Sequence, residues 1–161
     1  MDMNEAQALT IRLMNDHGIW QQGWRFGWMN GKRIMGMVRE RVRDFVRTKT
    51  LLLSRHMVRL NDESVVRNTI LHEIAHAIAG LDNGHNYVWK AVCIAVGANP
   101  ERCANPAKVN QVKHKYQVAC QCCNHVLSAH HRRPNFNRLQ RSYCSTCGQE
   151  KSFGKLIVVT T

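Results

Sequence analysis

The sequence predicts an α+β protein in which helices pack on a small sheet, followed by a small metal-binding domain. Three observations support this fold class. A mainly apolar helical stretch carries two histidines and a glutamate at a metal-binding spacing. Residues 24–54 contain alternating and apolar runs that are typical of strands. Two cysteine pairs lie near the C-terminus, beyond a change in composition. We therefore expect one domain at residues 1–108 and a second at residues 109–161.

Composition and charge exclude several classes of protein. The 161 residues are 44% hydrophobic and 21% charged, which suits a folded core and excludes wholesale disorder. No apolar run reaches the roughly 18 residues that span a bilayer, so no membrane partner is expected. The acidic N-terminus does not resemble a signal peptide, so we expect an intracellular protein of the cytoplasm and nucleoid, or of a eukaryotic nucleus. The net charge of +12 favours nucleic acid as a partner.

The N-terminal third predicts a helix followed by strands. Residues 4–17 have the apolar spacing of an amphipathic helix. An aromatic residue then recurs at every second position of residues 24–28, which predicts a strand with its aromatic face on the core. A base-stacking platform is the alternative. Asn30-Gly31 is a hairpin signal, so residues 34–38 are expected to form the returning strand.

The next segment leads into the histidine-containing helix. Residues 39–49 are rich in arginine and leave their secondary structure open; they form either a solvated face or a phosphate-binding patch. Residues 50–54 are typical of a buried strand. Asp62 and the acidic residue after it then start a helix that should end near Gly80.

The helix that ends near Gly80 contains the pattern H-E-x-x-H. Residues four apart share one helix face, so His72 and His76 can present two imidazoles to one metal ion. Glu73 can reach a metal-bound water without being a ligand itself. Burying these three polar side chains in an apolar run is unfavourable unless a metal engages them, which favours a metal site over two structural histidines. The pattern therefore predicts a zinc hydrolase.

A catalytic zinc needs a third protein ligand and one open position. The turn signal that follows Gly80 allows the chain to double back and bring His85 to the metal. Asp82, in the turn itself, is the competing third ligand. Residues 86–96 then show helical spacing, which makes Cys93 a buried helix residue and not a nucleophile.

These residues resemble the SprT-like zinc metalloprotease family, which includes Spartan. The resemblance implies a zincin-like metalloprotease fold and a DNA-associated protease that degrades proteins covalently crosslinked to DNA. It also implies that His72, His76 and His85 are zinc ligands and that Glu73 is the catalytic base. The family commonly has glycine directly after the third histidine, whereas Asn86 stands there in this chain. The likeness covers most of the chain and rests on His72-Glu73-Ile74-Ala75-His76, His85, Trp89, Val96-Gly97 and Pro100-Glu101-Arg102-Cys103.

The C-terminal cysteines predict a second, structural zinc site of the zinc-ribbon type. They form two C-x-x-C pairs with 20 residues between them, a spacing that suits four thiolates around one ion. Cys122 is the alternative to Cys123 in the first pair. Asn124 and Gly148, which directly follow the pairs, suit the left-handed turns of such knuckles. The four expected ligands are Cys120, Cys123, Cys144 and Cys147.

The loop between the cysteine pairs is a candidate DNA contact. From residue 108 onward the only acidic residue is Glu150. Cations mixed with an aromatic ring suit single-stranded or junction DNA, through phosphate contacts and stacking, and a solvated ribbon tip is the alternative. The candidate residues are Arg132, Arg133, Phe136, Arg138 and Arg141.

Together these features predict a zinc-dependent protease that cleaves proteins crosslinked or tightly bound to DNA. It would hold one catalytic and one structural zinc, and its partners would be DNA and DNA-bound proteins. Two alternatives remain open: a non-catalytic zinc-ribbon protein with a DNA-binding or regulatory role, and a regulatory metallopeptidase that cuts a specific partner. The intact Glu73 argues against the first, and the acid-poor ribbon argues against the second.

Overall fold

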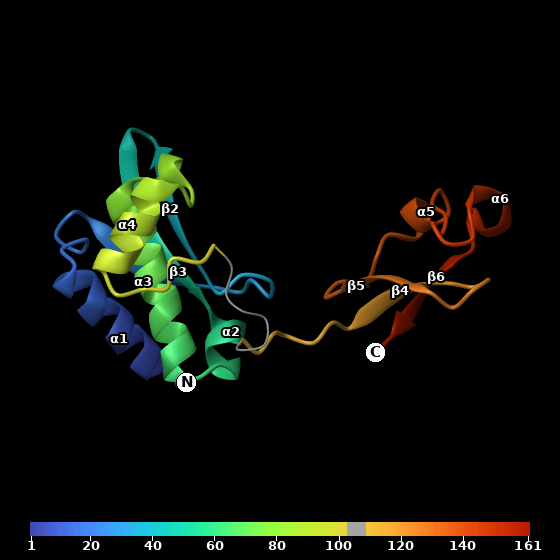
Figure 1. Cartoon of the computed structure of the whole chain (residues 1–161), viewed down its shortest axis with the longest axis horizontal. Coiled ribbons are helices and arrows are strands. Elements are labelled where there is room, and N and C mark those ends of the chain that lie inside the picture. The colour runs from blue at the N-terminus through green and yellow to red at the C-terminus, as the bar shows by residue number, and fades with distance from the viewer. Residues whose placement is uncertain (103–108) are drawn as a thin grey trace. The chain divides into compact units, whose positions relative to one another are not determined.

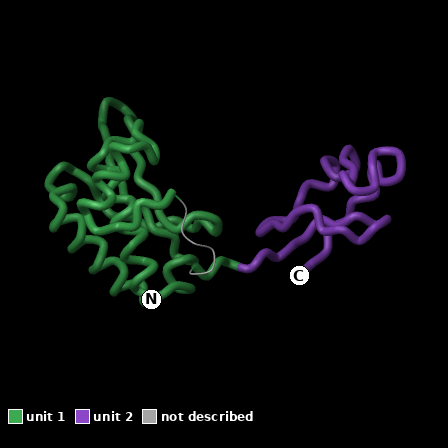
Figure 2. Tube along the Cα trace, viewed as in Figure 1, with its two compact units in different colours: residues 1–112 green, residues 113–161 purple. Residues whose placement is uncertain are grey.

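The structure is a computed structural model that describes residues 1–102 and 109–161 (Figure 1). It forms two compact units, residues 1–112 and 113–161 (Figure 2). The predicted α+β fold class is confirmed, because the first unit has helices on a small sheet and the second has its own three-stranded sheet with a four-cysteine cluster. The predicted domain boundary after residue 108 borders residues 103–108, which, with Cys103 among them, lie outside the described residues.

The first unit is built around a three-stranded sheet. Its central strand, β3 (Val46–Ser54), pairs in parallel with β1 (Trp24–Met29) and antiparallel with β2 (Gly36–Arg43). The apolar end of β3 explains this central place, because Leu51 and Leu53 are completely buried between neighbours. The helices of the unit are α1 (Met3–Asp16), α2 (Arg55–Leu60), α3 (Glu63–Ala79), the short 3-10 helix η1 (Leu81–Asn83) and α4 (Tyr87–Ala95).

The predicted hairpin at Asn30-Gly31 is wrong. β1 and β2 flank β3 and do not pair with each other. The tight turn instead joins β2 to β3, where Asp44 and Phe45 have φ angles of 49° and 63°. Two successive positive φ angles are typical of the two-residue type I′ hairpin turn. Residues 39–49, whose structure the sequence left open, form this hairpin.

Side-chain alternation divides the sheet into a helix-covered face and an open face. Phe26, Val38 and Leu51 are neighbours in the strand register and belong to the core. Arg41 and Thr48 pair with each other in the register, and their side chains point to the opposite face of the sheet. Both residues are exposed. The core on the covered face is completed by side chains of α1 and α3, among them Leu9, Leu13, Ile70 and Ile74.

The helix that carries the histidines begins and ends as its sequence predicts. Asp62 caps its start by accepting a hydrogen bond from the Val65 amide at 3.0 Å, and Gly80 follows its end with a φ of 90°. The short helix α2 was not among the predicted elements. The hydroxyl of Ser54 starts it by accepting a hydrogen bond from the Met57 amide at 3.2 Å. Local capping thus sets where the chain leaves the sheet and where α3 starts.

The second unit is a small antiparallel sheet with two short helices. β4 is central, in the order β5-β4-β6. Its core consists of few residues, two of which are cysteines. In the part of the chain that the structure describes, none of the helices has the length and apolar character needed to cross a bilayer. The elements of the second unit are β4 (Tyr116–Cys120), β5 (Val126–His130), α5 (Phe136–Leu139), α6 (Gln149–Ser152) and β6 (Leu156–Thr160).

Candidate metal centres

Three histidines converge where α3 meets the turn that follows it. His72 and His76 lie one helical turn apart on α3. The short helix η1 and Gly84, with a φ of 53°, turn the chain back so that His85 faces them. The Nε2 atom of His85 lies 3.2 Å from the Nε2 atom of His72 and 3.2 Å from that of His76. The structure thus brings together the three histidines that the sequence singled out.

The spacing of these nitrogen atoms suits a metal ion. Zinc–nitrogen bonds of about 2.0–2.1 Å in tetrahedral geometry place the ligand nitrogens about 3.3 Å apart. The two distances of 3.2 Å are close to this value. Three protein ligands also leave one coordination position for water or substrate, which is the arrangement of catalytic zinc sites. The histidine cluster is therefore a candidate metal site with an open position.

The environment keeps these imidazoles neutral, as metal ligation requires. Burial, together with the neighbouring His76 and His85, lowers the pKa of His72 to about 4. Burial, together with His85, likewise lowers the pKa of His76 to about 4. The pKa of His85 is also lowered, first by burial and then by the positive charge of Arg102. At neutral pH the ring nitrogens of the cluster are therefore free to bind a cation.

Trp89 of α4 forms the wall behind the three histidines. Its ring is fully buried, with centroids 4.7 Å from His72, 5.1 Å from His76 and 4.5 Å from His85. A rigid aromatic surface of this kind restricts the rotation of all three imidazoles. In the sequence, Trp89 served only as a mark of family resemblance, and this supporting role was missed. Its place one turn after His85 in an apolar helix was the available signal.

Glu73 lies beside the cluster as a buried carboxyl group. It is 7% exposed and is one of five buried polar or charged residues of the described chain. Burial raises the pKa of Glu73 from 4.5 to about 7, and a hydrogen bond from the backbone amide of Val38 opposes this rise. A carboxyl group with a pKa near neutrality can both accept and release a proton, which is the property of a general acid–base residue.

Gly36 holds the start of β2 against the glutamate. A Cβ atom at Gly36 would lie 2.8 Å from Cγ and 3.1 Å from Oε1 of Glu73, and 3.0 Å from Cγ2 of Thr69. Only a residue without a side chain therefore permits this approach of strand to helix. No local pattern in the sequence marks Gly36, because the contact joins a strand to a helix more than 30 residues away.

The histidines and Glu73 line a cleft of about 690 Å³ in the first unit. Its lining includes apolar side chains, three of them methionines, and two arginines. These lining residues are Met35, Met37, Met57, Leu81, Arg33 and Arg102. A volume of this size lies within the range of about 300–1,000 Å³ that is typical of ligand pockets.

Two polar residues on either side of His85 lie apart from the cluster. Asp82, the alternative third ligand, belongs to η1 and is exposed, and among the described residues the histidine cluster includes no carboxylate. Tyr87, the first residue of α4, is 81% exposed and does not line the cleft.

The second candidate metal site is the cysteine cluster of the second unit. The Sγ atoms of Cys120 and Cys147 are 3.9 Å apart, and those of Cys123 and Cys144 are 3.8 Å apart. Tetrahedral zinc with sulfur bonds of about 2.3 Å requires about 3.8 Å between sulfurs. The predicted left-handed turns are present, because φ is 56° at Asn124 and 77° at Gly148. These turns let the backbone fold around the sulfurs.

The thiols of this cluster have different pKa values because their sulfur atoms lie close together. Hydrogen bonds from the backbone amides, first that of Cys147, lower the pKa of Cys144 to about 6. A hydrogen bond with Cys123 and burial raise the pKa of Cys147 to about 12. Four neighbouring thiolates therefore require a cation to be ionised together. Cys122 lies outside the cluster: it is exposed, and its Sγ contacts the carbonyl oxygen of Lys151 at 3.3 Å.

The candidate DNA-binding residues lie on the surface of the second unit, between β5 and α6. Phe136 is 68% exposed at the start of α5. It lines, with Arg133, a second cavity of about 610 Å³ whose other walls are mostly apolar. The three remaining candidates, Arg132, Arg138 and Arg141, are exposed.

Comparison with protein families gives a match for the first unit. Residues 8–114 match the model of the SprT-like family. This segment is about two thirds of the chain and contains the three histidines, Glu73, Trp89 and Gly36. The comparison with curated proteins gave no match.

Proposed function

The chain belongs to the SprT-like family, and on this premise we propose that it is a zinc-dependent endopeptidase that cleaves proteins crosslinked or tightly bound to DNA. The observation that carries the proposal is the position of the buried Glu73 beside three convergent histidine nitrogens in an open cleft. A structural metal site needs neither the open position nor the adjacent carboxyl group.

The chemistry divides between the ion and the side chains. His72, His76 and His85 would hold a zinc ion, and Trp89 would fix the orientation of their rings. The ion would supply a water molecule of lowered pKa and a polarised substrate carbonyl group. A carboxylate oxygen of Glu73 accepts the proton of the attacking water and returns it to the leaving amine. A pKa of about 7 suits both transfers, because neither protonation state is strongly disfavoured near neutral pH.

The basic second unit supports the proposal that the substrates are bound to DNA. We infer that its four clustered cysteines bind a structural zinc and that the basic loop around α5 contacts single-stranded or junction DNA. From residue 108 onward the chain has one acidic residue, so the unit attracts polyanions. Binding of both units to one DNA-bound substrate raises the effective concentration of the peptide bond at the cleft. Weak sequence selectivity in the cleft is then sufficient for targeting.

Metal analysis is the first test of this proposal. Purified protein should contain two zinc ions per chain, one in each cluster. The His72→Ala variant should lose one of them and the Cys144→Ser variant the other. A preparation in which the His72→Ala variant keeps the full metal content would contradict the histidine site.

Cleavage of a protein crosslinked to DNA is the second test. Wild type should degrade this substrate faster than the same protein without DNA, and Glu73→Gln should be inactive while keeping its metal. Equal activity of wild type and Glu73→Gln would refute the peptidase. Equal cleavage with and without DNA would refute targeting by DNA and favour a peptidase with a protein partner.

A further inference from the structure

We propose that the β2–β3 hairpin of the first unit is a binding surface for single-stranded nucleic acid. The phosphates would lie along three arginines of β2, Arg39, Arg41 and Arg43, which we call the arginine row, and a base would stack on Phe45 at the turn. This surface goes beyond the proposed function, which places DNA on the second unit. It depends on the first unit alone and does not require peptidase activity.

Strand geometry places the three arginines on the open face of the sheet. Successive side chains of a strand point to opposite faces, and Val38 of β2 belongs to the helix-covered core. The arginines of the row are an odd number of residues from Val38, so their side chains point to the open face. Its partners in the register of β3 are Thr50, Thr48 and Val46, respectively. On this face, β2 and β3 therefore present arginines and contribute no carboxylate.

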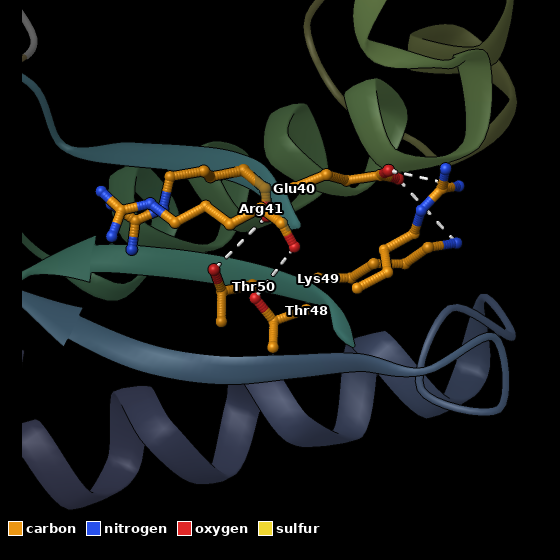
Figure 3. Close-up of polar contacts among 7 residues, drawn as sticks. Glu40, Arg41, Thr48, Lys49 and Thr50 are labelled. Carbon is orange, nitrogen blue, oxygen red and sulfur yellow. Dashed lines mark hydrogen bonds and ion pairs between the residues drawn. The ribbon is translucent and has the colours of Figure 1, made fainter. Parts of the chain in front are cut away.

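The acidic residue of β2 is engaged on the other face. Glu40 forms ion pairs with Arg47 and Lys49, both at 3.8 Å, and Figure 3 shows the carboxylate of Glu40 together with Lys49, away from the side chain of Arg41. The hydroxyl groups of Thr48 and Thr50 donate to the carbonyl oxygens of Arg41 and Arg39. These contacts satisfy the strand backbone and leave the guanidinium groups for a ligand.

The arginine row has few internal partners for its charge. Among the described residues, no carboxylate forms an ion pair with Arg39 or Arg41. The Nε atom of Arg39 is buried and has no hydrogen-bond partner in the structure, although such groups are normally satisfied. Arg43 pairs with Asp44 at 3.5 Å, but both side chains are about nine-tenths exposed, so this pair contributes little. A polyanion would provide partners for the guanidinium groups of Arg41 and Arg43, which are exposed.

The spacing of the row favours an extended nucleic acid strand. Alternate residues of a strand are about 6.8 Å apart. This distance is similar to the separation of successive phosphates in an extended single strand, so each guanidinium can contact one phosphate. A groove or row of cations that follows the backbone is the usual device for binding single strands without sequence preference.

The turn of the hairpin adds an aromatic residue that no packing contact accounts for. Phe45 is completely exposed and has a φ of 63°, a conformation that is rare for bulky side chains. Val42 and Val46 beside it are 67% and 61% exposed. A strained backbone that displays an apolar ring next to cations is the kind of outlier that points to a ligand. Base stacking on an aromatic ring beside phosphate-binding arginines accounts for both features.

The test measures binding of the full chain to a fluorescein-labelled oligothymidine of about 20 nucleotides by fluorescence anisotropy at several salt concentrations. The double variant Arg41→Gln/Arg43→Gln should weaken binding at least about tenfold and reduce the slope of log K against log salt by about 1.4. The matched control is Arg59→Gln/Arg67→Gln, which removes the same charge from exposed positions of α2 and α3. It should change affinity less than about threefold.

Phe45→Gly is the second variant, and it separates stacking from charge. It should weaken binding about fivefold or more while leaving the salt slope unchanged, because no cation is removed. Circular dichroism of each variant checks that the fold is kept. Equal losses in the arginine double variant and its control would overturn the proposal. Unchanged binding in both Phe45→Gly and the arginine double variant would do so as well.

Two further arms distinguish nucleic acid binding by the hairpin from membrane binding and from DNA binding by the second unit. If the hairpin variants lost binding to vesicles of anionic phospholipid but kept binding to the oligonucleotide, the ligand would be a membrane and the proposal would be overturned. Glu73→Gln should bind the oligonucleotide as wild type does. The binding measurement therefore tests the arginine row even if the peptidase proposal fails. If only Arg132→Gln/Arg133→Gln weakened binding, the arginine row would be refuted and DNA binding by the second unit would stand.

Discussion

Gly36 lies so close to Glu73 that a methyl group there would displace the carboxyl group. The Cβ of Gly36→Ala would meet Cγ of Glu73 at 2.8 Å. We expect this variant to lower kcat by about 10- to 100-fold, because small displacements of a catalytic group have effects of this order. Its zinc content should be unchanged, since no histidine moves. Peptidase assays and metal analysis on the same preparation measure both quantities.

Gly31→Ala is the matched control for Gly36→Ala. Its Cβ would meet its nearest neighbours, Cγ1 of Ile34 and Sδ of Met29, at 3.7 Å, which is an ordinary contact distance. Activity of this variant should therefore remain close to that of wild type. If both glycine variants lost activity alike, or if Gly36→Ala were fully active, the strand would not position Glu73.

Glu73 also makes the stability of the metal-free protein depend on pH. Burial raises its pKa from 4.5 to about 7, so the folded state holds this proton more tightly than the unfolded state does. The stabilisation is fully present below pH 4.5 and is lost as pH rises through 7. Glu73→Gln has no such loss. Relative to wild type it should gain up to about 3 kcal/mol in free energy of unfolding between about pH 4.5 and about pH 8.

Urea denaturation of chelator-treated protein at the two pH values measures this difference. Glu63→Gln, which removes an exposed carboxylate from the same helix, is the control. A constant difference between wild type and Glu73→Gln across the pH range would show that the carboxyl group is not buried as the structure places it.

At the scale of single elements, the sequence predicted the helix ends and turns that depend on interactions between neighbouring residues. The Asp62 cap, the end of α3 at Gly80 and the turn that returns His85 all depend on neighbours in sequence, and all were predictable. The pairing of strands was not. Asn30-Gly31 carries a hairpin signal, but β3 offers a more apolar partner to both flanking strands and separates them. Contacts between distant elements, such as the approach of Gly36 to Glu73, likewise have no local signature.

The sequence does not mark the true hairpin turn, because Phe45 is an unfavourable residue for it. A non-glycine residue in the left-handed region is destabilised by roughly 1–2 kcal/mol, and glycine loses roughly 0.5–1 kcal/mol more backbone entropy on folding. Phe45→Gly creates an Asp-Gly turn and removes no buried contact, since the ring is fully exposed. We expect it to raise the free energy of unfolding by up to about 1 kcal/mol.

Chemical denaturation of Phe45→Gly beside Phe45→Ala measures this gain. Alanine removes the ring but keeps the left-handed backbone, so Phe45→Ala should have nearly wild-type stability. A loss of stability in both variants would show that the ring packs on the protein and is not free for a ligand. The expected combination, a more stable hairpin that binds nucleic acid less well, is typical of residues maintained for function.

At the scale of the whole molecule, the two units differ in the size of the hydrophobic core that stabilises each fold. The first has a core of many buried aliphatic and aromatic side chains drawn from helices and sheet. The core of the second consists of Val118, Cys120, Leu139, Cys144 and Leu156, so two of its five buried residues are candidate metal ligands. A core this small needs a metal or similar crosslink to remain folded. The loss of metal should therefore unfold the second unit alone.

Cysteine variants test this dependence and the choice of ligands together. Cys123→Ser should lose one zinc and the slow amide hydrogen exchange of residues 113–161, while residues 1–102 remain protected. Cys122→Ser removes the neighbouring thiol, which faces Lys151 outside the cluster, and should keep both. Exchange measured by mass spectrometry resolves the two units separately. If Cys122→Ser released the metal instead, the first knuckle would have the tighter C-x-C geometry. If exchange increased equally in both units, they would not fold independently.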